Sequence, residues 1–335
     1  MPNNSAPVLE ICFGHERLRL EAWAPDSIRV RVAQGEVAED QPGALITPRP
    51  SPSDGALGGG RALVNGKLRA DVTVDGLVTF SRSEGGRELL SEQKAHFWWP
   101  GARLFTPTGN TYYRLEQRFS AYEGEKIFGL GQHLHGRFDQ KDLVIDLVQR
   151  NAEVSIPFLV SNRGYGFLWN SPAVGRVELA GNGTRWVADS ARQIDYWVTA
   201  GDEPAKILSR YAEVTGYAPE LPSWASGFWQ SKLRYRTQEE LLGVAREYHR
   251  RGVPLAVIVS DFFHWEHLGD WSFCADEWPD PSAMVGELGS MGTKLMVSVW
   301  PSLSPLSANY EPMLERGLLV SSEQGPTVQA TWPER

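Results

Sequence analysis

The sequence has little cysteine and no long apolar run. Cys12 and Cys274 are the only cysteines among 335 residues, which excludes a disulfide framework and a zinc site built on C-x-x-C pairs. No stretch approaches the roughly 18 consecutive apolar residues of a transmembrane helix. Residues 1–27 lack a basic segment followed by an apolar run, so we expect no signal peptide. These absences predict a cytoplasmic protein without a membrane partner.

Positive charge is also scarce. Lys and Arg total 33 against 41 Asp and Glu, and the net charge is −8. A general nucleic-acid binder needs a basic stripe that neutralises phosphate, and the sequence has none. It also has no G-x-G-x-x-G and no G-x-x-x-x-G-K-[ST] motif. We therefore expect neither a nucleic acid nor a nucleotide as partner.

Two groups of side chains are candidates for metal ligands. His133 and His135 are two positions apart, and His264, Glu266 and His267 lie close together further along. Neither group has the ligand spacing of a familiar zinc site. We expect no metal and no cofactor, and we interpret His264 and His267 as hydrogen-bonding residues of a loop.

The first two thirds of the chain predict β-structure. Ile28–Val32 alternates apolar and charged residues, as in a half-buried strand. Two alternating runs, Ala70–Val74 and Leu77–Phe80, flank Asp75-Gly76 and predict a hairpin with a tight turn. Further strands are expected at Thr111–Phe119, Val154–Val160, Tyr165–Trp169, Arg176–Leu179 and Gln193–Thr199. This spacing predicts a β-sandwich over residues 1–220, with Gln41–Gly60 as a surface loop.

From Leu221 the pattern changes to alternating strands and helices. Strands are expected at Gly227–Lys232, Leu255–Ser260 and Lys294–Trp300. Helices are expected after the capping box that begins at Thr237, after Asp280-Pro281, and over Ala308–Arg316. Three βα units in a row predict a parallel sheet, either part of a (β/α)₈ barrel or an open doubly wound sheet. A barrel needs about 250 residues, so residues 221–335 hold less than half of one.

Asp261 is the principal candidate site residue. It directly follows an apolar strand, and active sites of barrels form at the carboxyl ends of strands. The segment after it is unusually aromatic, with Phe262, Phe263, Trp265 and Trp271. A carboxylate beside aromatic rings suits a sugar, because the carboxylate accepts hydroxyl protons while the rings stack on C–H faces. The alternatives are a helix N-cap or a salt-bridged aspartate.

Trp300 follows the third strand and is interpreted either as a wall of the same site or as a core aromatic. The sequence has 13 Trp, as many as Phe. This high tryptophan content fits the same two interpretations, a sugar-binding site or a core. Retaining glycoside hydrolysis needs two carboxyl groups about 5–5.5 Å apart. No second carboxylate ends a separate strand, so the catalytic pair is incomplete. A hypothesis with Asp261 as nucleophile lacks its partner for that reason.

The motifs resemble glycoside hydrolase family 31, specifically its α-xylosidase-like branch. Six stretches carry the resemblance in the family's order: Arg19–Ala33, Phe128–Gln140, Ile156–Pro172, Leu221–Tyr235, Val257–Trp271 and Trp278–Leu288. The resemblance implies a galactose-mutarotase-like β-sandwich over 1–220. It further implies that residues 221–335 are the first three βα units of an incomplete (β/α)₈ TIM barrel, truncated before the fourth strand.

The resemblance also implies roles for matched residues. Asp261 matches the residue that hydrogen-bonds the sugar, and Trp271 and Trp300 match aromatic residues of that subsite. Phe262, Phe263 and Trp265 belong to the matching loop, whose phenylalanines crowd the space of a hexose CH₂OH group. His133–Asn151 matches a sandwich-domain loop that helps to form the site.

The nucleophile and the acid/base of the family match no residue here and are expected beyond Arg335. The resemblance thus implies the N-terminal part of a retaining α-glycosidase without a cofactor, inactive as this chain alone. An α-xylosidase acting on xylosylated oligosaccharides is the first hypothesis. An α-glucosidase of the same family and a non-catalytic carbohydrate-binding protein are the alternatives. Whether the full-length protein forms a homo-oligomer is left open.

Overall fold

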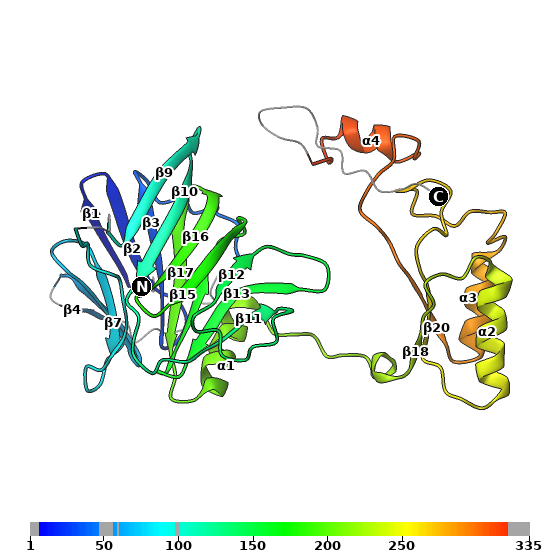
Figure 1. Cartoon of the computed structure of the whole chain (residues 1–335), viewed down its shortest axis with the longest axis horizontal. Helices are drawn as coiled ribbons and strands as arrows, with labels where there is room; N and C mark the ends of the chain where they lie inside the picture. The colour runs from blue at the N-terminus through cyan, green and yellow to red at the C-terminus, as the bar shows by residue number, and fades with distance from the viewer. Residues whose placement is uncertain (1–6, 47–55, 59, 98–100, 321–335) are drawn as a thin grey trace, which may run out of the picture. The chain divides into compact units, whose positions relative to one another are not determined.

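The chain forms two compact units, Met1–Ala218 and Pro219–Arg335. A computed structural model describes residues 7–46, 56–58, 60–97 and 101–320 (Figure 1). The expected surface loop Gln41–Gly60 falls partly outside the described residues, at 47–55 and 59. Residues 56–58 of that loop form a short strand, so the prediction of a continuous loop is wrong there.

The first unit contains three antiparallel sheets, which confirms the predicted β-sandwich class. The seven-stranded sheet has the order β1 (Val8–Phe13), β2 (Glu16–Ala22), β3 (Ser27–Gln34), β17 (Gln193–Ala200), β14 (Tyr165–Trp169), β13 (Val154–Ser161), β11 (Ile127–Gln132). A five-stranded sheet has the order β12 (Val144–Leu147), β15 (Gly175–Ala180), β16 (Gly183–Ala191), β10 (Tyr112–Phe119), β9 (Arg103–Gly109). The other five-stranded sheet runs β4 (Ala56–Gly58), β5 (Ala62–Asn65), β6 (Leu68–Val72), β7 (Val78–Arg82), β8 (Glu88–Ser91).

Aromatic rings at the core of this unit join the seven-stranded sheet to the five-stranded sheet that contains β10 and β16. Phe167 of β14 stacks on Trp186 of β16, with ring centroids 4.8 Å apart. Its ring also meets Phe119 of β10 edge-on at 5.2 Å. All three side chains are fully buried, and each such burial stabilises the fold by about 1.5–3 kcal/mol. Much of the tryptophan in this unit is therefore core, as with Trp169, Trp186 and Trp197.

The predicted hairpin exists, but its turn is longer than expected. Val72 of β6 pairs with Val78 of β7, and the Thr73 N–H donates to the Leu77 carbonyl at 2.9 Å. Val74, expected in the strand, lies in the turn and is exposed. Gly76 has a φ of +82°, and a Cβ there would lie 2.9 Å from the Phe13 ring. The turn thus packs its glycine against the Phe13 ring.

Helix α1 (Pro204–Thr215) was not expected from the sequence. It buries Ile207 against the seven-stranded sheet. Gly166 and Gly201 make this close approach possible, because a Cβ on either would lie 2.5 or 2.6 Å from Ile207. Only Ile207 and Val214 of this helix are buried, and Leu208 is exposed, so little of the helix belongs to the core.

The second unit is a parallel sheet with helices, as expected. Its strands are β18 (Trp229–Gln230), β19 (Val257–Ser260) and β20 (Lys294–Val297), and its helices are α2 (Gln238–Arg250), α3 (Pro281–Ser290), α4 (Tyr310–Glu315) and the 3₁₀ turn Ser223–Ser226. β19 pairs in parallel with both neighbours. The strands are shorter than predicted, so Trp300 lies beyond the third strand. The described residues form part of a barrel and no closed one.

The predicted caps are present at the N-termini of the two longer helices of this unit, α2 and α3. The Thr237 hydroxyl accepts the Glu240 N–H at 3.2 Å, and the Glu240 carboxylate accepts the Arg236 N–H at 2.8 Å. Asp280 caps α3 by accepting the Ala283 N–H at 2.9 Å. The two helices lie side by side along the sheet (Figure 1). In the described ranges no helix is both long and apolar enough to cross a membrane.

Leu241 of α2, Leu288 of α3 and Ile258 of β19 belong to one buried cluster between these helices and the sheet. Leu241, Leu288 and Ile258 are all fully buried. This cluster contains only residues of the second unit, whereas the aromatic core above contains only residues of the first. Each unit therefore has a hydrophobic core of its own.

Candidate functional site

The carboxyl ends of the three parallel strands place the predicted site residues together. Ser260, the last residue of β19, pairs with Val297, the last residue of β20. Asp261 and Trp300 therefore leave the sheet at the same edge. In parallel α/β folds ligands bind at this edge, since the loops that follow the strands are free to vary there.

Four rings form an aromatic cluster at this edge: Phe262, Phe263, Trp265 and Trp300. Trp300 contacts the other three, with centroid distances of 5.6 Å to Phe262, 6.1 Å to Phe263 and 5.8 Å to Trp265. Phe262 and Phe263 meet edge-on at 4.6 Å. The segments after β19 and β20 thus contribute to one apolar surface. The structure brings together four of the six residues predicted to bind substrate.

The members of this group differ in exposure. Trp265 is only 2% exposed, and this burial favours a role in packing beneath the cluster. Its predicted contact with a sugar stays a prediction. Phe262, Phe263 and Trp300 are partly exposed, so they can offer ring faces or edges to a ligand.

Trp271 joins the cluster through a hydrogen bond. Its indole Nε1 donates to the Trp300 carbonyl at 2.9 Å, and its side chain is 43% exposed. The residue has a φ of +51°, in the left-handed region that bulky side chains rarely adopt. Trp271 therefore links the two loops and keeps an indole face accessible.

Asp261 is held by its own loop. Its Oδ1 accepts the Phe262 N–H at 2.8 Å, and its carbonyl lies 3.0 Å from His264 Nδ1. Since a carbonyl only accepts, Nδ1 carries the proton. Among the described residues no Lys or Arg pairs with Asp261, and no helix begins there. The alternatives of a salt bridge and a helix N-cap are therefore wrong, and Oδ2 points to no partner within the described part of the chain.

His264 supports this arrangement from the interior. It is 2% exposed, and burial lowers its pKa despite the opposing hydrogen bond to the Asp261 carbonyl. Its carbonyl accepts the Cys274 N–H at 2.7 Å. His264 is thus neutral at pH 7 and acts as a hydrogen-bonding residue of the loop, as expected from the sequence.

Further hydrogen bonds to backbone carbonyls connect the two loops. The Ser304 N–H donates to the Leu268 carbonyl at 2.7 Å, and Asn309 Nδ2 donates to the Gly269 carbonyl at 2.8 Å. Together with the bond from Trp271, these contacts tie the segment 261–280 to the segment 298–309. The tie keeps Asp261 and Trp300 in register at the sheet edge.

Arg234 is a residue of this edge that the sequence analysis did not single out. It follows β18, the first strand of the sheet, and its guanidinium donates to the Phe263 carbonyl at 3.3 Å. Its position just beyond a strand end is the signal that could have identified it.

In the described part of the chain, the candidate metal ligands do not form a metal site. His133 and His135 stack with ring centroids 5.6 Å apart, and His133 Nε2 donates to the Leu130 carbonyl at 2.8 Å. In the part of the chain that the structure describes, no group of three or more His, Cys, Asp or Glu side chains is placed to hold a metal ion. The segment His133–Asn151 also includes β12, so it is not entirely a loop.

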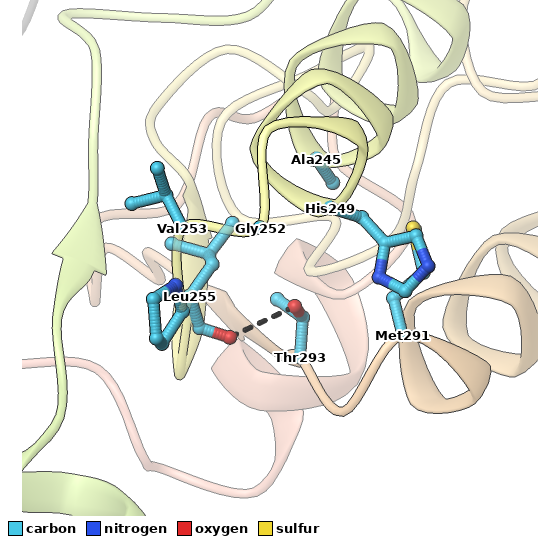
Figure 2. A pocket seen from close by; sticks show the side chains of 8 residues that line it. Ala245, His249, Gly252, Val253, Leu255, Met291 and Thr293 are labelled. Atoms are coloured by element: carbon cyan, nitrogen blue, oxygen red, sulfur yellow. Dashed lines mark hydrogen bonds between the residues drawn. The ribbon is translucent and has the colours of Figure 1, made fainter.

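A small pocket lies at the opposite edge of the sheet. Figure 2 shows Ala245 and His249 of α2 near Met291 and Thr293, with Thr293 Oγ1 donating to the Leu255 carbonyl at 2.9 Å. Leu255 and Thr293 precede β19 and β20, so this is the amino edge. Its volume is about 150 Å³, below the roughly 300–1,000 Å³ of most ligand pockets. The carboxyl edge remains the candidate site.

Two family models match most of the chain. Residues 218–335 match the glycosyl hydrolases family 31 TIM-barrel domain. Residues 17–178 match the glycosyl hydrolase 31 N-terminal galactose mutarotase-like domain. The two matches follow the division of the molecule into a β-sandwich and a parallel α/β unit.

Curated relatives extend over more than this chain. An uncharacterized family 31 glucosidase of Pseudescherichia vulneris is 41% identical over 96% of this chain and 64% of its own length. An α-xylosidase of Saccharolobus solfataricus is 38% identical over 62% of this chain and 30% of its own. The chain thus spans about a third to two thirds of the relatives it matches.

Two solved structures are also similar to this chain and extend beyond it. A family 31 α-xylosidase from a soil metagenome, complexed with xylose, is 40% identical with a TM-score of 0.91. The similarity covers 98% of this chain and 51% of that one. A xylosidase from Aspergillus niger is 28% identical with a TM-score of 0.88, over 98% of this chain and 49% of its own.

Proposed function

The chain belongs to glycosyl hydrolase family 31, and we propose that it supplies the sugar-binding subsite of a retaining α-xylosidase. The observation that carries the proposal is the position of Asp261 beside the stacked pair Phe262 and Trp300, at the carboxyl edge of the sheet. The partner is an oligosaccharide whose terminal sugar enters this subsite.

The arrangement suits recognition of a sugar ring. Asp261 presents a partly exposed carboxylate, and a carboxylate accepts hydroxyl protons in hydrogen bonds that are stronger than neutral ones. Phe262 and Trp300 offer apolar surface to the C–H face of the ring. A few placed polar groups within a mostly apolar lining are typical of small-molecule sites.

The proposed chemistry is double displacement through a glycosyl-enzyme intermediate. It needs a nucleophilic carboxylate and an acid/base, which the family resemblance assigns to segments beyond Arg335. The residues of this chain bind and orient the sugar for those groups. Such positioning contributes substantially to catalysis, because a near-attack geometry replaces a chance encounter.

The choice of xylose over glucose rests on the aromatic cluster. Phe262 and Phe263 come from the loop that also carries Asp261, so their bulk lies beside the bound sugar. Glucose differs from xylose by one CH₂OH group, and a group of that size changes binding in such pockets by about 1–3 kcal/mol. Relatives named α-xylosidase support this choice, while a lysosomal α-glucosidase of mouse, 27% identical, keeps glucose as the alternative.

The test is hydrolysis by the protein expressed from its complete coding sequence. We expect p-nitrophenyl α-xyloside to be cleaved with a higher kcat/KM than the α-glucoside, and the released xylose to be the α-anomer at first by NMR. Asp261→Asn should lower kcat/KM by about 10- to 100-fold, as expected for the loss of a charged hydrogen bond.

Asp276→Asn is the matched control. Asp276 lies in the same loop, is exposed, and makes no hydrogen bond or ion pair with the other described residues. An equal loss in both variants would contradict the role of Asp261. Saturable xylose binding without turnover would instead support the non-catalytic binding protein.

A further inference from the structure

Arg234 contacts one residue of the aromatic cluster in two ways. Its guanidinium NH1 donates to the Phe263 carbonyl at 3.3 Å. Its Cζ also lies 5.7 Å from the centroid of the Phe263 ring, within the range of a cation–π contact. Arg234 follows β18, whereas Phe263 follows β19. One side chain therefore holds both the backbone and the ring of a residue from the neighbouring loop.

Phe263 has a backbone that needs such support. Its φ is +62°, in the left-handed region, which is uncommon for a bulky residue. Such residues persist only where the surrounding structure holds them, and they concentrate at functional sites. Three rings also lie near the Phe263 ring: Phe262 at 4.6 Å, Trp265 at 6.0 Å and Trp300 at 6.1 Å between centroids. Arg234, by contrast, contacts the backbone of Phe263 as well as its ring.

We propose that Arg234 is a positioning residue that fixes Phe263 and thereby sets the preference of the subsite for a pentose over a hexose. The inference rests on the proposed function, because it concerns the size of the sugar that the cluster admits. Without Arg234 the Phe263 backbone can relax from the left-handed region. The ring then moves, and the space for a CH₂OH group opens.

A direct contact between Arg234 and the sugar is the competing explanation. Arg234 is partly exposed, and a guanidinium can donate to hydroxyls. The two explanations differ in one respect: a positioning role depends on the Phe263 ring, and a direct contact does not. A double-mutant cycle between Arg234 and Phe263 therefore separates them.

The first experiment measures kcat/KM for p-nitrophenyl α-xyloside and α-glucoside in the enzyme expressed from its complete coding sequence. Arg234→Met keeps the apolar stem and removes both contacts. We expect it to lower the xyloside-to-glucoside ratio about tenfold, the size of effect that one group of this bulk produces. Arg234→Lys keeps a cation near the ring and should retain part of the ratio. Arg250→Met is the control, because Arg250 is exposed on α2 and, among the described residues, forms its ion pair with Glu247 alone.

The cycle adds Phe263→Ala and the double variant. We expect Phe263→Ala to lower the ratio as much as Arg234→Met does, and the double variant to lower it no further. An unchanged ratio in Arg234→Met would overturn the proposal. A further drop on adding Arg234→Met to Phe263→Ala would also overturn it and would establish a direct contact with the sugar.

A second measurement does not depend on catalysis. Near-UV circular dichroism of the 335-residue chain reports the asymmetric surroundings of aromatic rings. Arg234→Met should weaken the aromatic bands, while Arg250→Met should leave them unchanged. Identical spectra for wild type and Arg234→Met would overturn the positioning role. A wild-type enzyme that does not prefer the xyloside would instead contradict the proposed function, with the spectra still testing the role of Arg234.

Discussion

The indole Nε1 of Trp271 donates a hydrogen bond to the backbone carbonyl of Trp300 at 2.9 Å, across 29 positions of sequence. This bond joins the loops that follow two neighbouring parallel strands. It connects the residue that offers an exposed indole to the residue at the centre of the aromatic cluster. The shape of the proposed subsite therefore depends on a polar contact as well as on the packing of rings.

Trp271→Phe tests this bond, because phenylalanine keeps an aromatic ring and lacks the donor. We expect a loss of about 1 kcal/mol in the free energy of unfolding, typical of one hydrogen bond, and a raised KM for the xyloside. Trp229→Phe is the control, since the Trp229 indole donates to the Ala225 carbonyl within its own segment at 3.1 Å. It should cost similar stability and leave KM unchanged. Equal KM effects would contradict the linking role of Trp271.

Gly269→Ala should destabilise the same pair of loops. Gly269 has a φ of +97°, and an added Cβ would lie 2.8 Å from Leu303 Cγ and 2.9 Å from its Cα. Strain and a clash with backbone act together, so we expect a loss of about 2–4 kcal/mol in chemical denaturation.

Gly292→Ala is the matched control for that change. Its φ is +75°, but a Cβ there would meet no atom within 4 Å. Only the left-handed strain remains, which costs about 1–2 kcal/mol. If both variants lose the same stability, the close contact with Leu303 contributes nothing.

Lowering the pH should destabilise the second unit through His264. Burial lowers the pKa of His264 from its usual value of 6.5, so between that value and the lowered one the unfolded state binds more protons than the folded state. The stabilisation is therefore complete above pH 6.5 and is lost as the pH falls through this window. Urea unfolding at pH 7.5 and at pH values just above and below 6 would measure the slope.

His264→Asn provides the comparison for this pH dependence. An asparagine Nδ2 takes the place of the histidine Nδ1 and donates to the Asp261 carbonyl without titrating. The variant should unfold with a flatter dependence on pH. A slope equal to that of the wild type would show that other groups cause the effect.

Asp195→Ala should strongly destabilise the β-sandwich. Asp195 is 2% exposed and accepts from Arg29 Nε at 3.0 Å and from its NH2 at 2.5 Å. Removal of the carboxylate leaves the Arg29 guanidinium buried without its ionic partner, and such a loss costs about 3–5 kcal/mol. Arg17→Ala is the control, because it breaks the half-exposed pair with Glu10 and should cost less than about 1 kcal/mol.

The sequence predicted those structural features that depend on interactions between residues close together in the chain. Thr237 and Asp280 cap helices as expected, because capping involves only residues within one turn. The alternation around Asp75-Gly76 predicted a hairpin, but not the close contact of Gly76 with Phe13, which is distant in sequence. Helix α1 was not predicted, since its position depends on Gly166 of β14 and on Gly201 just after β17, and its own sequence reveals neither contact.

The same distinction holds for the candidate site. Asp261 and Trp300 were identified because each follows an apolar strand, and the parallel register then brings them to one edge. The burial of Trp265 and the contacts of Arg234 could not be predicted, since both depend on the paths that three loops take in space. Phe263 likewise shows nothing in sequence of its left-handed backbone.

The ties between the segments 261–280 and 298–309 have a consequence for protein engineering. Hydrogen bonds from Trp271, Ser304 and Asn309 and the ring contacts of Trp300 join these segments. A designer who grafts the aspartate and its aromatic neighbours onto another barrel would leave them without their anchor unless both segments move together. The unit of transplantation is thus the pair of loops, and Arg234 would have to accompany it as a third piece.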